Sequence, residues 1–283
     1  MGFIAIIGAG ALGGAVAQTL AVRDRVREIR LIDPAGAIAR GKALDIQQSG
    51  PVDNFSAVLT AAESVDAAVG AQVVVVADSA TGAEHNGEPG LGIIRQLTRA
   101  GHGGPIVFAG ATQMDVMGRA ITELHLERRQ VIGSAPLALE SALRAVAGLL
   151  LDGSAVEVCL RVVGVPPRHA VVAWEEATAF GQPLSSQLPP HAIAGLAARI
   201  PGLWPPGPYA LASAASRIIE AIARGSRRRF SCFVVADDGP VRAAVVALPA
   251  ELGPQGVARV LEPALTRQER TGMENAVERA RTS

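Results

Sequence analysis

An apolar run that leads directly into a glycine-rich turn is the feature that most constrains this chain. Residues 3–7 read Phe-Ile-Ala-Ile-Ile, and Gly8-Ala-Gly-Ala-Leu-Gly13 follows at once. A helix-length segment covers 11–22, and a second apolar run over 29–32 ends in Asp33. A buried strand, a GxGxxG turn, a helix and an acid about twenty residues further on make up the fingerprint of a dinucleotide site. The pattern therefore predicts a βαβ unit that binds a dinucleotide.

Each position of this fingerprint has a physical role. Gly8 permits the tight turn, Gly10 lets the backbone approach the pyrophosphate, and Gly13 lets the helix pack closely on the sheet. The helix N-terminus directs its N–H groups and the positive end of its dipole at the phosphates. Asp33 would accept hydrogen bonds from the adenosine ribose and repel a 2′-phosphate, which favours NAD, although the nearby Arg40 leaves NADP open. The predicted cofactor is NAD, and the candidate binding residues are Gly8, Gly10, Ala11, Leu12, Gly13, Asp33 and Ala77.

The first 22 residues carry no charged side chain, so a signal peptide or membrane anchor is the alternative interpretation of this region. A secretory signal needs a positively charged segment ahead of its apolar stretch, and none is present. The glycines between 8 and 14 suit a turn and a helix start better than a lipid-facing span. We therefore favour the nucleotide-binding interpretation.

Composition indicates a cytoplasmic α/β protein. The 283 residues are 49% hydrophobic, enough for a full core in two lobes. The 26 basic and 26 acidic side chains balance, which gives no electrostatic support for a nucleic-acid or membrane partner. Cys159 and Cys232 fit no metal-ligand spacing and are expected to be reduced thiols. We predict a small-molecule ligand and no metal.

Apolar β-rich runs alternate with helix-length segments up to residue 150, as a doubly wound parallel sheet with crossover helices requires. Beyond that residue, antiparallel strands and further helices are expected. The boundary is therefore placed between a cofactor domain, 1–150, and a substrate-type α+β domain, 151–283. The predicted strands cover 2–7, 28–33, 56–60, 72–77, 105–109, 130–132, 156–163, 170–174, 230–236 and 241–247. Helices are predicted near 11–22, 36–49, 64–69, 90–100, 114–126, 138–150, 190–199, 208–224, 254–260 and 266–281.

Several segments together resemble the NAD-dependent lactate/malate dehydrogenases, closer to the malate branch. Beyond the glycine fingerprint and Asp33, they are the runs 41–51, 73–76, 114–117, 131–133, 212–216, 218–222 and 249–261. The resemblance implies a Rossmann domain followed by this family's C-terminal domain. It also implies a homodimer or homotetramer, with the helices near 36–49 and 208–224 at the dimer contact. The implied chemistry is hydride transfer between nicotinamide and a hydroxy or keto acid.

Most of the family's substrate machinery is missing from the matching positions. The family's histidine lies in a Gly-Gly-His-Gly-Asp motif, and Pro166 stands at that position. In the closing loop, Gly82 and Glu88 stand at the two arginine positions by simple counting. The asparagine of the Thr-Asn-Pro segment is replaced by Thr112. The loop acids Asp78, Glu84 and Glu88 are expected to face water, with a cationic or amine-bearing substrate as the alternative.

A few weak candidates for a rearranged catalytic site remain. His169 lies three residues past the expected histidine, Glu140 would orient it, and Arg144 or Arg168 would bind an acid. One hypothesis is therefore an oxidoreductase with an atypical substrate. The second is a catalytically inactive NAD(H)-binding relative that acts as a sensor or assembly partner. The third, an ordinary malate or lactate dehydrogenase with misaligned residues, fails because no arginine occurs over 73–94.

Overall fold

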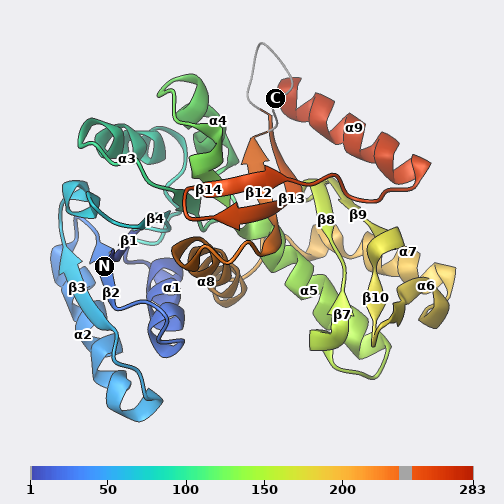
Figure 1. The fold of residues 1–283 in the computed structure, drawn as a ribbon, viewed down its shortest axis with the longest axis horizontal. Helices are drawn as coiled ribbons and strands as arrows, with labels where there is room; N and C mark the ends of the chain where they lie inside the picture. Colours follow the sequence, from blue (N-terminus) through green and yellow to red (C-terminus); the bar gives the residue numbers. More distant parts are fainter. Residues whose placement is uncertain (1, 236–243, 283) are drawn as a thin grey trace.

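Six parallel strands form one half of the largest sheet in the computed structural model, which describes residues 2–235 and 244–282. Their spatial order is β3 (Val58–Ala62), β2 (Glu28–Ile32), β1 (Ile4–Ile7), β4 (Val73–Val76), β5 (Ile106–Phe108) and β6 (Val131–Gly133). The helices α1 (Ala11–Val22), α2 (Gly36–Asp53), α3 (Gly87–Arg99) and α4 (Met114–Thr122) cover the faces of this half, and a 3-10 helix spans Val65–Ala68 (Figure 1). The order 3-2-1-4-5-6 is that of a doubly wound dinucleotide-binding sheet. The predicted fold class is confirmed.

The place where the strand order reverses positions the site. All residues of β1 and β4 are buried, as expected for parallel strands covered on both faces. The chain runs outward from β1 to β2 and β3, and then returns to place β4 on the other side of β1. The crevice at the carboxyl ends of β1 and β4 is therefore the topological switch point, where ligands bind in sheets of this type.

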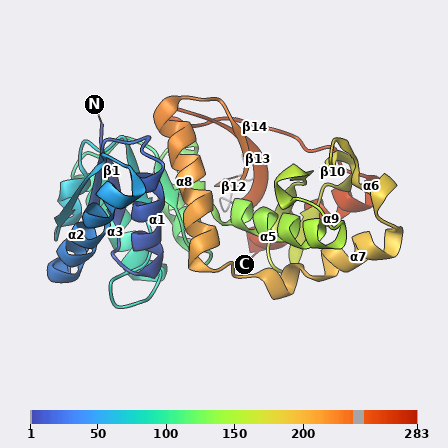
Figure 2. The same ribbon diagram turned by 90° about the horizontal axis from the view of Figure 1, so that it is seen from below.

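The sheet continues past β6 with antiparallel strands. They are β12 (Arg229–Val235), β13 (Val245–Gly253), β8 (Val162–Val165) and β9 (His169–Val172), and β14 (Gly256–Val260) pairs with β13. A second, small sheet contains β11 (Gln182–Pro183), β10 (Thr178–Ala179) and β7 (Val158–Cys159). The remaining helices are α5 (Ala135–Leu150), α6 (Leu184–Gln187), α7 (Pro190–Ala198), α8 (Pro208–Arg224) and α9 (Arg267–Thr282). Figure 2 shows α8 between the two ends of the molecule, where it contacts both α1 and α5.

Two predicted elements differ from the structure. The helix predicted over 254–260 is wrong, because these residues form a turn and β14. Gly256 has a φ of +102°, and a Cβ on it would lie 2.0 Å from the carbonyl oxygen of Arg129, so the chain reverses there in a hairpin. The single strand predicted over 156–163 is divided between β7 and β8. Residues 236 and 241–243 of two other predicted strands lie outside the described residues.

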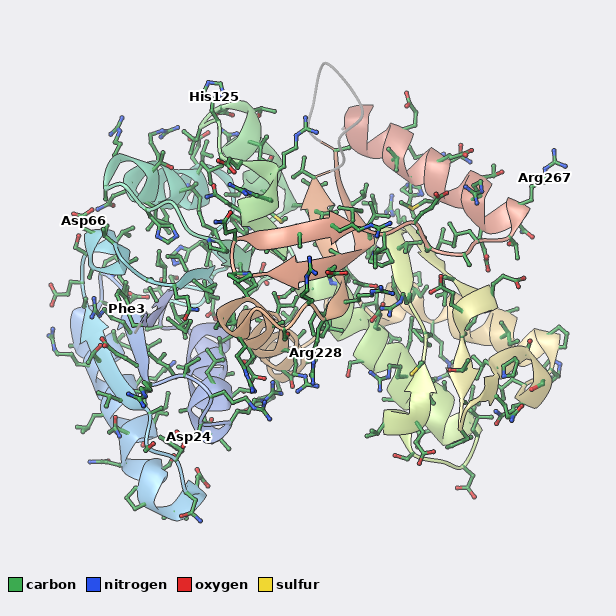
Figure 3. The ribbon with its side chains drawn as sticks, in the orientation of Figure 1. Phe3, Asp24, Asp66, His125, Arg228 and Arg267 are labelled. Carbon is green, nitrogen blue, oxygen red and sulfur yellow. The ribbon has the colours of Figure 1, made fainter. Side chains whose placement is uncertain are left out.

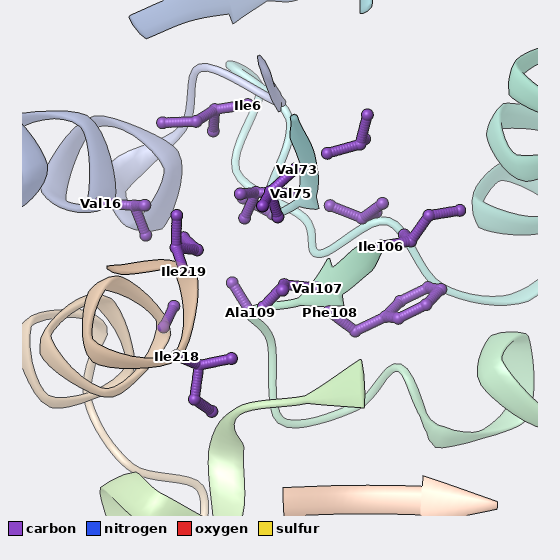
Figure 4. Packing of buried hydrophobic residues seen from close by; sticks show 14 of the residues in the cluster. Ile6, Val16, Val73, Val75, Ile106, Val107, Phe108, Ala109, Ile218 and Ile219 are labelled. Carbon is purple, nitrogen blue, oxygen red and sulfur yellow. The ribbon is translucent and has the colours of Figure 1, made fainter. Parts of the chain in front are cut away.

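Two hydrophobic clusters form the core. The larger lies under the parallel half of the sheet and includes side chains of α8 and β12, while the smaller is built around α5, β8 and α7. Figure 4 shows Ile218 and Ile219 of α8 near Val16 of α1 and the strand residues Val75 and Val107. The domain boundary at residue 150 stays a prediction, since α8 and β12 come after it and yet pack into the first cluster. No helix among the described residues has the length and apolar character needed to cross a membrane.

Candidate functional site

The glycine turn joins β1 to α1 at the switch point. Gly8 has a φ of +107°, a conformation that side chains other than glycine rarely adopt, and its N–H donates to the Ile32 carbonyl at 2.7 Å. A Cβ on Gly13 would lie 2.0 Å from the Gly8 carbonyl oxygen. The helix can therefore approach the turn this closely only with glycine at 13. Ala77 lies on the other side, where its N–H donates to the Ile7 carbonyl at 2.9 Å.

Lys42, the only lysine of the chain, braces this turn from α2. Its Nζ donates to the carbonyl oxygens of Ala9 and Gly10 at 2.8 and 2.6 Å. The Gly10 carbonyl also accepts from the Gly14 N–H at 3.1 Å. Loss of Lys42 would therefore leave the Ala9 carbonyl without this donor in a partly buried space, which is costly. The sequence interpretation did not single out Lys42, since its partners are backbone atoms that only the fold brings near.

Asp33 lies at the end of β2, as predicted, but its carboxylate is engaged by the chain itself. Oδ2 accepts from the N–H groups of Ala9 and Ala80 at 2.9 and 2.8 Å, and Oδ1 accepts from Ala35 at 2.9 Å. Its exposed fraction is 2%. Burial alone would raise the pKa of Asp33, but the three backbone hydrogen bonds outweigh it and lower the pKa below its ordinary value. The carboxylate is therefore charged and already has three donors.

Asp78 occupies the N-terminus of α1. Its Oδ2 accepts from the Leu12 N–H at 3.0 Å and its Oδ1 accepts from the Gly13 N–H at 2.8 Å. The side chain is 7% exposed. The expectation that Asp78 faces water is therefore wrong: a carboxylate is attracted to the unpaired N–H groups and the positive dipole end of a helix. A Cβ on Gly10 would lie 2.4 Å from Asp78 Cγ, so the carboxylate fills the space next to this glycine.

Glu84 holds the other end of the loop of residues 78–86, which connects β4 to α3. Its carboxylate accepts from the N–H groups of Ala111 and Thr112 at 3.0 and 2.8 Å and from the Thr112 hydroxyl at 2.6 Å. Thr112 is the residue at the position of the family's asparagine. Glu88, by contrast, is exposed in the first turn of α3 and pairs with Arg119 at 2.5 Å. Two loop acids thus turn inward, while Glu88 faces water as expected.

His85 is a residue of this loop that no sequence motif singled out. It is half-buried near Asp33 and Asp78, and within the described part of the chain its buried Nε2 has no hydrogen-bond partner. Burial lowers the pKa of His85, and the charges of the two aspartates only partly oppose this. A neutral imidazole therefore lies beside two carboxylates at the switch point.

The turn fits a dinucleotide, but the loop in this conformation does not. Gly8, Gly10 and Gly13 have no side chain that would block a pyrophosphate, and the helix N-terminus has N–H groups that could donate to it. Those donors at Leu12 and Gly13 are bonded to Asp78, and Ala80 of the loop is bonded to Asp33. The candidate cofactor residues are therefore brought together as predicted, in a crevice that the chain's own acids fill.

The weak catalytic candidates are not brought together. Glu140 is 4% exposed, and its carboxylate accepts from the Val162 N–H at 3.0 Å and from the Ser231 hydroxyl. Arg144 donates through Nη2 to two backbone carbonyls, those of Ala155 and Val156. His169 lies on β9, where its Nε2 is 3.4 Å from Arg279 Nη1 of α9. Each candidate thus has its own separate partners, and Pro166 lies in the turn between β8 and β9.

A cavity of about 390 Å³ lies between α5, α8 and β12. Glu140 and Arg144 line it, together with Arg161, Arg217 and Arg229, whereas His169 does not. The pKa of Arg217 is lowered, first by burial and then by the positive charges of Arg23 and Arg228. Figure 3 labels Arg228, which lies near the end of α8. The cavity therefore has a positively charged wall. No cluster of metal-ligating side chains occurs within residues 2–235 and 244–282.

The whole chain is similar to known dehydrogenases. A malate dehydrogenase of Thermomicrobium roseum is 26% identical, and the alignment covers 98% of this chain and 96% of the relative. Two solved structures share the fold across 99% of this chain. The malate dehydrogenase of Salinibacter ruber, covered to 95%, has a TM-score of 0.88 at 21% identity. The lactate dehydrogenase of Cryptosporidium parvum, covered to 96% and complexed with lactic acid and nicotinamide adenine dinucleotide, has a TM-score of 0.87 at 20% identity.

No family model matches the chain. The match to curated relatives nevertheless runs from end to end, and the strand order, the glycine turn and the acid after β2 agree with it. The chain is therefore similar over its whole length to lactate and malate dehydrogenases.

Proposed function

We propose that this protein is an NAD(H)-binding oxidoreductase that transfers a hydride to or from a hydroxy or keto acid at a rearranged substrate site. The observation that carries the proposal is the glycine turn at the switch point, in a chain similar to malate dehydrogenases over its whole length. The cofactor would supply the hydride. The chain's residues would bind and orient the two ligands.

The charges around the turn support NAD over NADP. Asp33 is charged at the position where an adenosine ribose would lie, and a carboxylate repels a 2′-phosphate. Arg40, which left NADP open, has an ion pair with Glu63 at 2.9 Å, so its charge is already partnered. The lactate dehydrogenase of Cryptosporidium parvum was solved with nicotinamide adenine dinucleotide, which is consistent with this choice.

A second candidate function is an inactive NAD(H)-binding relative that acts as a sensor or assembly partner. Pro166 favours it, because proline cannot take up or release a proton and it stands at the position of the family's histidine. The separation of His169 from Glu140 and Arg144 points the same way. The two candidates share the cofactor and differ in turnover.

The experiment has a binding part and a turnover part. Calorimetry with NADH and with NADPH measures the affinity, and absorbance at the NADH band follows turnover on a panel of hydroxy acids. Turnover that is lost in His169→Ala and kept in His191→Ala, which changes an exposed histidine of α7, would support the rearranged enzyme. NADH binding without turnover on any acid would support the inactive relative. No binding of NADH at any concentration up to the millimolar range would refute both.

We further propose a cytoplasmic homodimer or homotetramer that acts on small molecules, with no nucleic-acid or membrane partner. Exposed apolar side chains on α2, Ile38 and Leu44, support a contact between copies on that helix. The apolar side chains of α8 give less support, since Ile218, Ile219 and others are buried within the chain. Light scattering coupled to size-exclusion chromatography would measure the assembly, and Leu44→Glu should shift it toward the monomer.

A further inference from the structure

We infer that the Asp78 carboxylate occupies the N–H groups of α1 that would otherwise bind a pyrophosphate, and we call it a resident anion. A dinucleotide then binds only after the loop of residues 78–86 has moved away. The inference rests on the proposed function and deepens it, because it names the group that regulates access to the same site. Its basis is the hydrogen bonding of three carboxylates, those of Asp78, Asp33 and Glu84.

The first step is that the Asp78 carboxylate and a pyrophosphate need the same atoms. Both are anions with oxygen acceptors, and both are attracted to the N–H groups at the start of a helix. The Leu12 and Gly13 N–H groups donate to Asp78 at 3.0 and 2.8 Å. Each N–H has one hydrogen to donate. A second anion therefore cannot take these donors until Asp78 releases them.

The second step is that the loop backbone accompanies the carboxylate. The Ser79 carbonyl oxygen would lie 2.5 Å from a Cβ on Gly10, and the Gly10 N–H donates to the Asp78 carbonyl at 3.0 Å. The glycine that should let a phosphate approach is thus covered by the loop. Rotation of the Asp78 side chain alone would not uncover it.

The third step is that independent contacts of two residues that follow Asp78, Ala80 and Glu84, also hold the loop closed. The Ala80 N–H donates to Asp33 at 2.8 Å, and it uses the carboxylate that a ribose would need. Glu84 accepts three hydrogen bonds from Ala111 and Thr112 at the far end of the loop. Because acids at both ends bond to backbone N–H groups, the loop is a closed cover and its opening must break several charge-assisted hydrogen bonds.

An ordinary helix cap would be a simpler role for Asp78, and the two roles predict different results. Removal of a cap lowers stability and leaves the affinity for anions unchanged. Removal of a resident anion also frees two donors and takes away a repelling charge, so the affinity for pyrophosphate and for NADH rises. Affinity, rather than stability, is therefore the deciding measurement.

The experiment compares wild type with Asp78→Asn, Asp78→Ala and the control Asp115→Ala. Asp115 is an exposed acid in the first turn of α4. Its removal therefore also deletes one negative charge near a helix N-terminus, but away from the glycine turn. Calorimetry at constant ionic strength measures the affinity for inorganic pyrophosphate and for NADH. We expect both affinities to rise by about tenfold or more in Asp78→Ala and by less in Asp78→Asn, which keeps one acceptor oxygen. Asp115→Ala should behave as wild type.

The two probes separate this inference from the proposed function. If pyrophosphate binds Asp78→Ala more tightly while NADH binds none of the proteins, the resident anion is supported and the NAD proposal fails. If wild type binds NADH and Asp78→Ala binds it no better, the NAD proposal stands and the inference is overturned. Equal pyrophosphate affinity in all folded variants also overturns it. Circular dichroism checks folding, and Asp78→Asn decides the question if the alanine variant does not fold.

Discussion

Replacement of Glu140 by glutamine should change how the stability of this protein depends on pH. Glu140 is buried between α5, β8 and β12, and burial raises its pKa to about 7 from an ordinary value of 4.5. The hydrogen bonds from Ser231 and Val162 and the charges of Arg161 and Arg144 oppose this rise without cancelling it. Glutamine keeps the shape and one acceptor oxygen but has no proton to lose.

The magnitude follows from the two pKa values. Between pH 4.5 and 7 the folded protein holds a proton on Glu140 that the unfolded chain has released. The free energy of unfolding therefore falls as the pH rises, by about 1.4 kcal/mol per unit. Over the full interval this amounts to about 3 kcal/mol, and above pH 7 the group adds no further change. Glu140→Gln lacks this loss, so at pH 8 its free energy of unfolding should exceed that of wild type by roughly 3 kcal/mol.

Urea unfolding followed by circular dichroism at several pH values from 5 to 8 measures the effect. Glu127→Gln, which removes an exposed carboxylate that pairs with Arg129, serves as the control and should follow the wild-type profile. The decisive quantity is the gap between Glu140→Gln and wild type, which should widen as the pH rises. If the two profiles stay parallel from pH 5 to 8, the carboxylate is not held protonated by burial and the reasoning fails.

Three further predictions concern close packing, the thiols and the lysine brace. Gly13→Ala should prevent folding or lower the free energy of unfolding in urea by several kcal/mol, since its Cβ would lie 2.0 Å from a backbone oxygen. Gly41→Ala has open space around its Cβ, so it should raise the free energy of unfolding by about 0.5–1 kcal/mol. Cys159 is exposed and should react with a thiol reagent in the native protein, while the buried Cys232, whose pKa burial raises, should react only after unfolding. Lys42→Met should lower the free energy of unfolding by about 1–3 kcal/mol, because the Ala9 carbonyl loses its lysine donor and the Gly10 carbonyl keeps only the Gly14 N–H. An unchanged melting curve would refute this role of Lys42.

The sequence by itself determined the parallel half of the fold and the position of the turn. These features depend on local properties. The apolar runs 4–7 and 73–76 are long enough for buried strands, and the glycines at 8, 10 and 13 permit a backbone conformation and close contacts that a side chain would prevent. The helix predicted over 254–260 failed for a related local reason, since Gly256 marks a hairpin turn there. The resemblance to dehydrogenases likewise rested on the order of short motifs along the chain.

Only the tertiary structure decided where the charged side chains go. From sequence, Asp78 was an acid in a loop and was expected to face water, yet its carboxylate bonds to N–H groups 65 and 66 residues away. Glu140 meets Ser231 across 91 residues. The physical reason is the same in both cases: a carboxylate lies where unpaired donors are, and those donors are backbone N–H groups and hydroxyls that the strand order brings together. Residue type therefore indicated which groups could carry charge, and the fold determined which partners they meet.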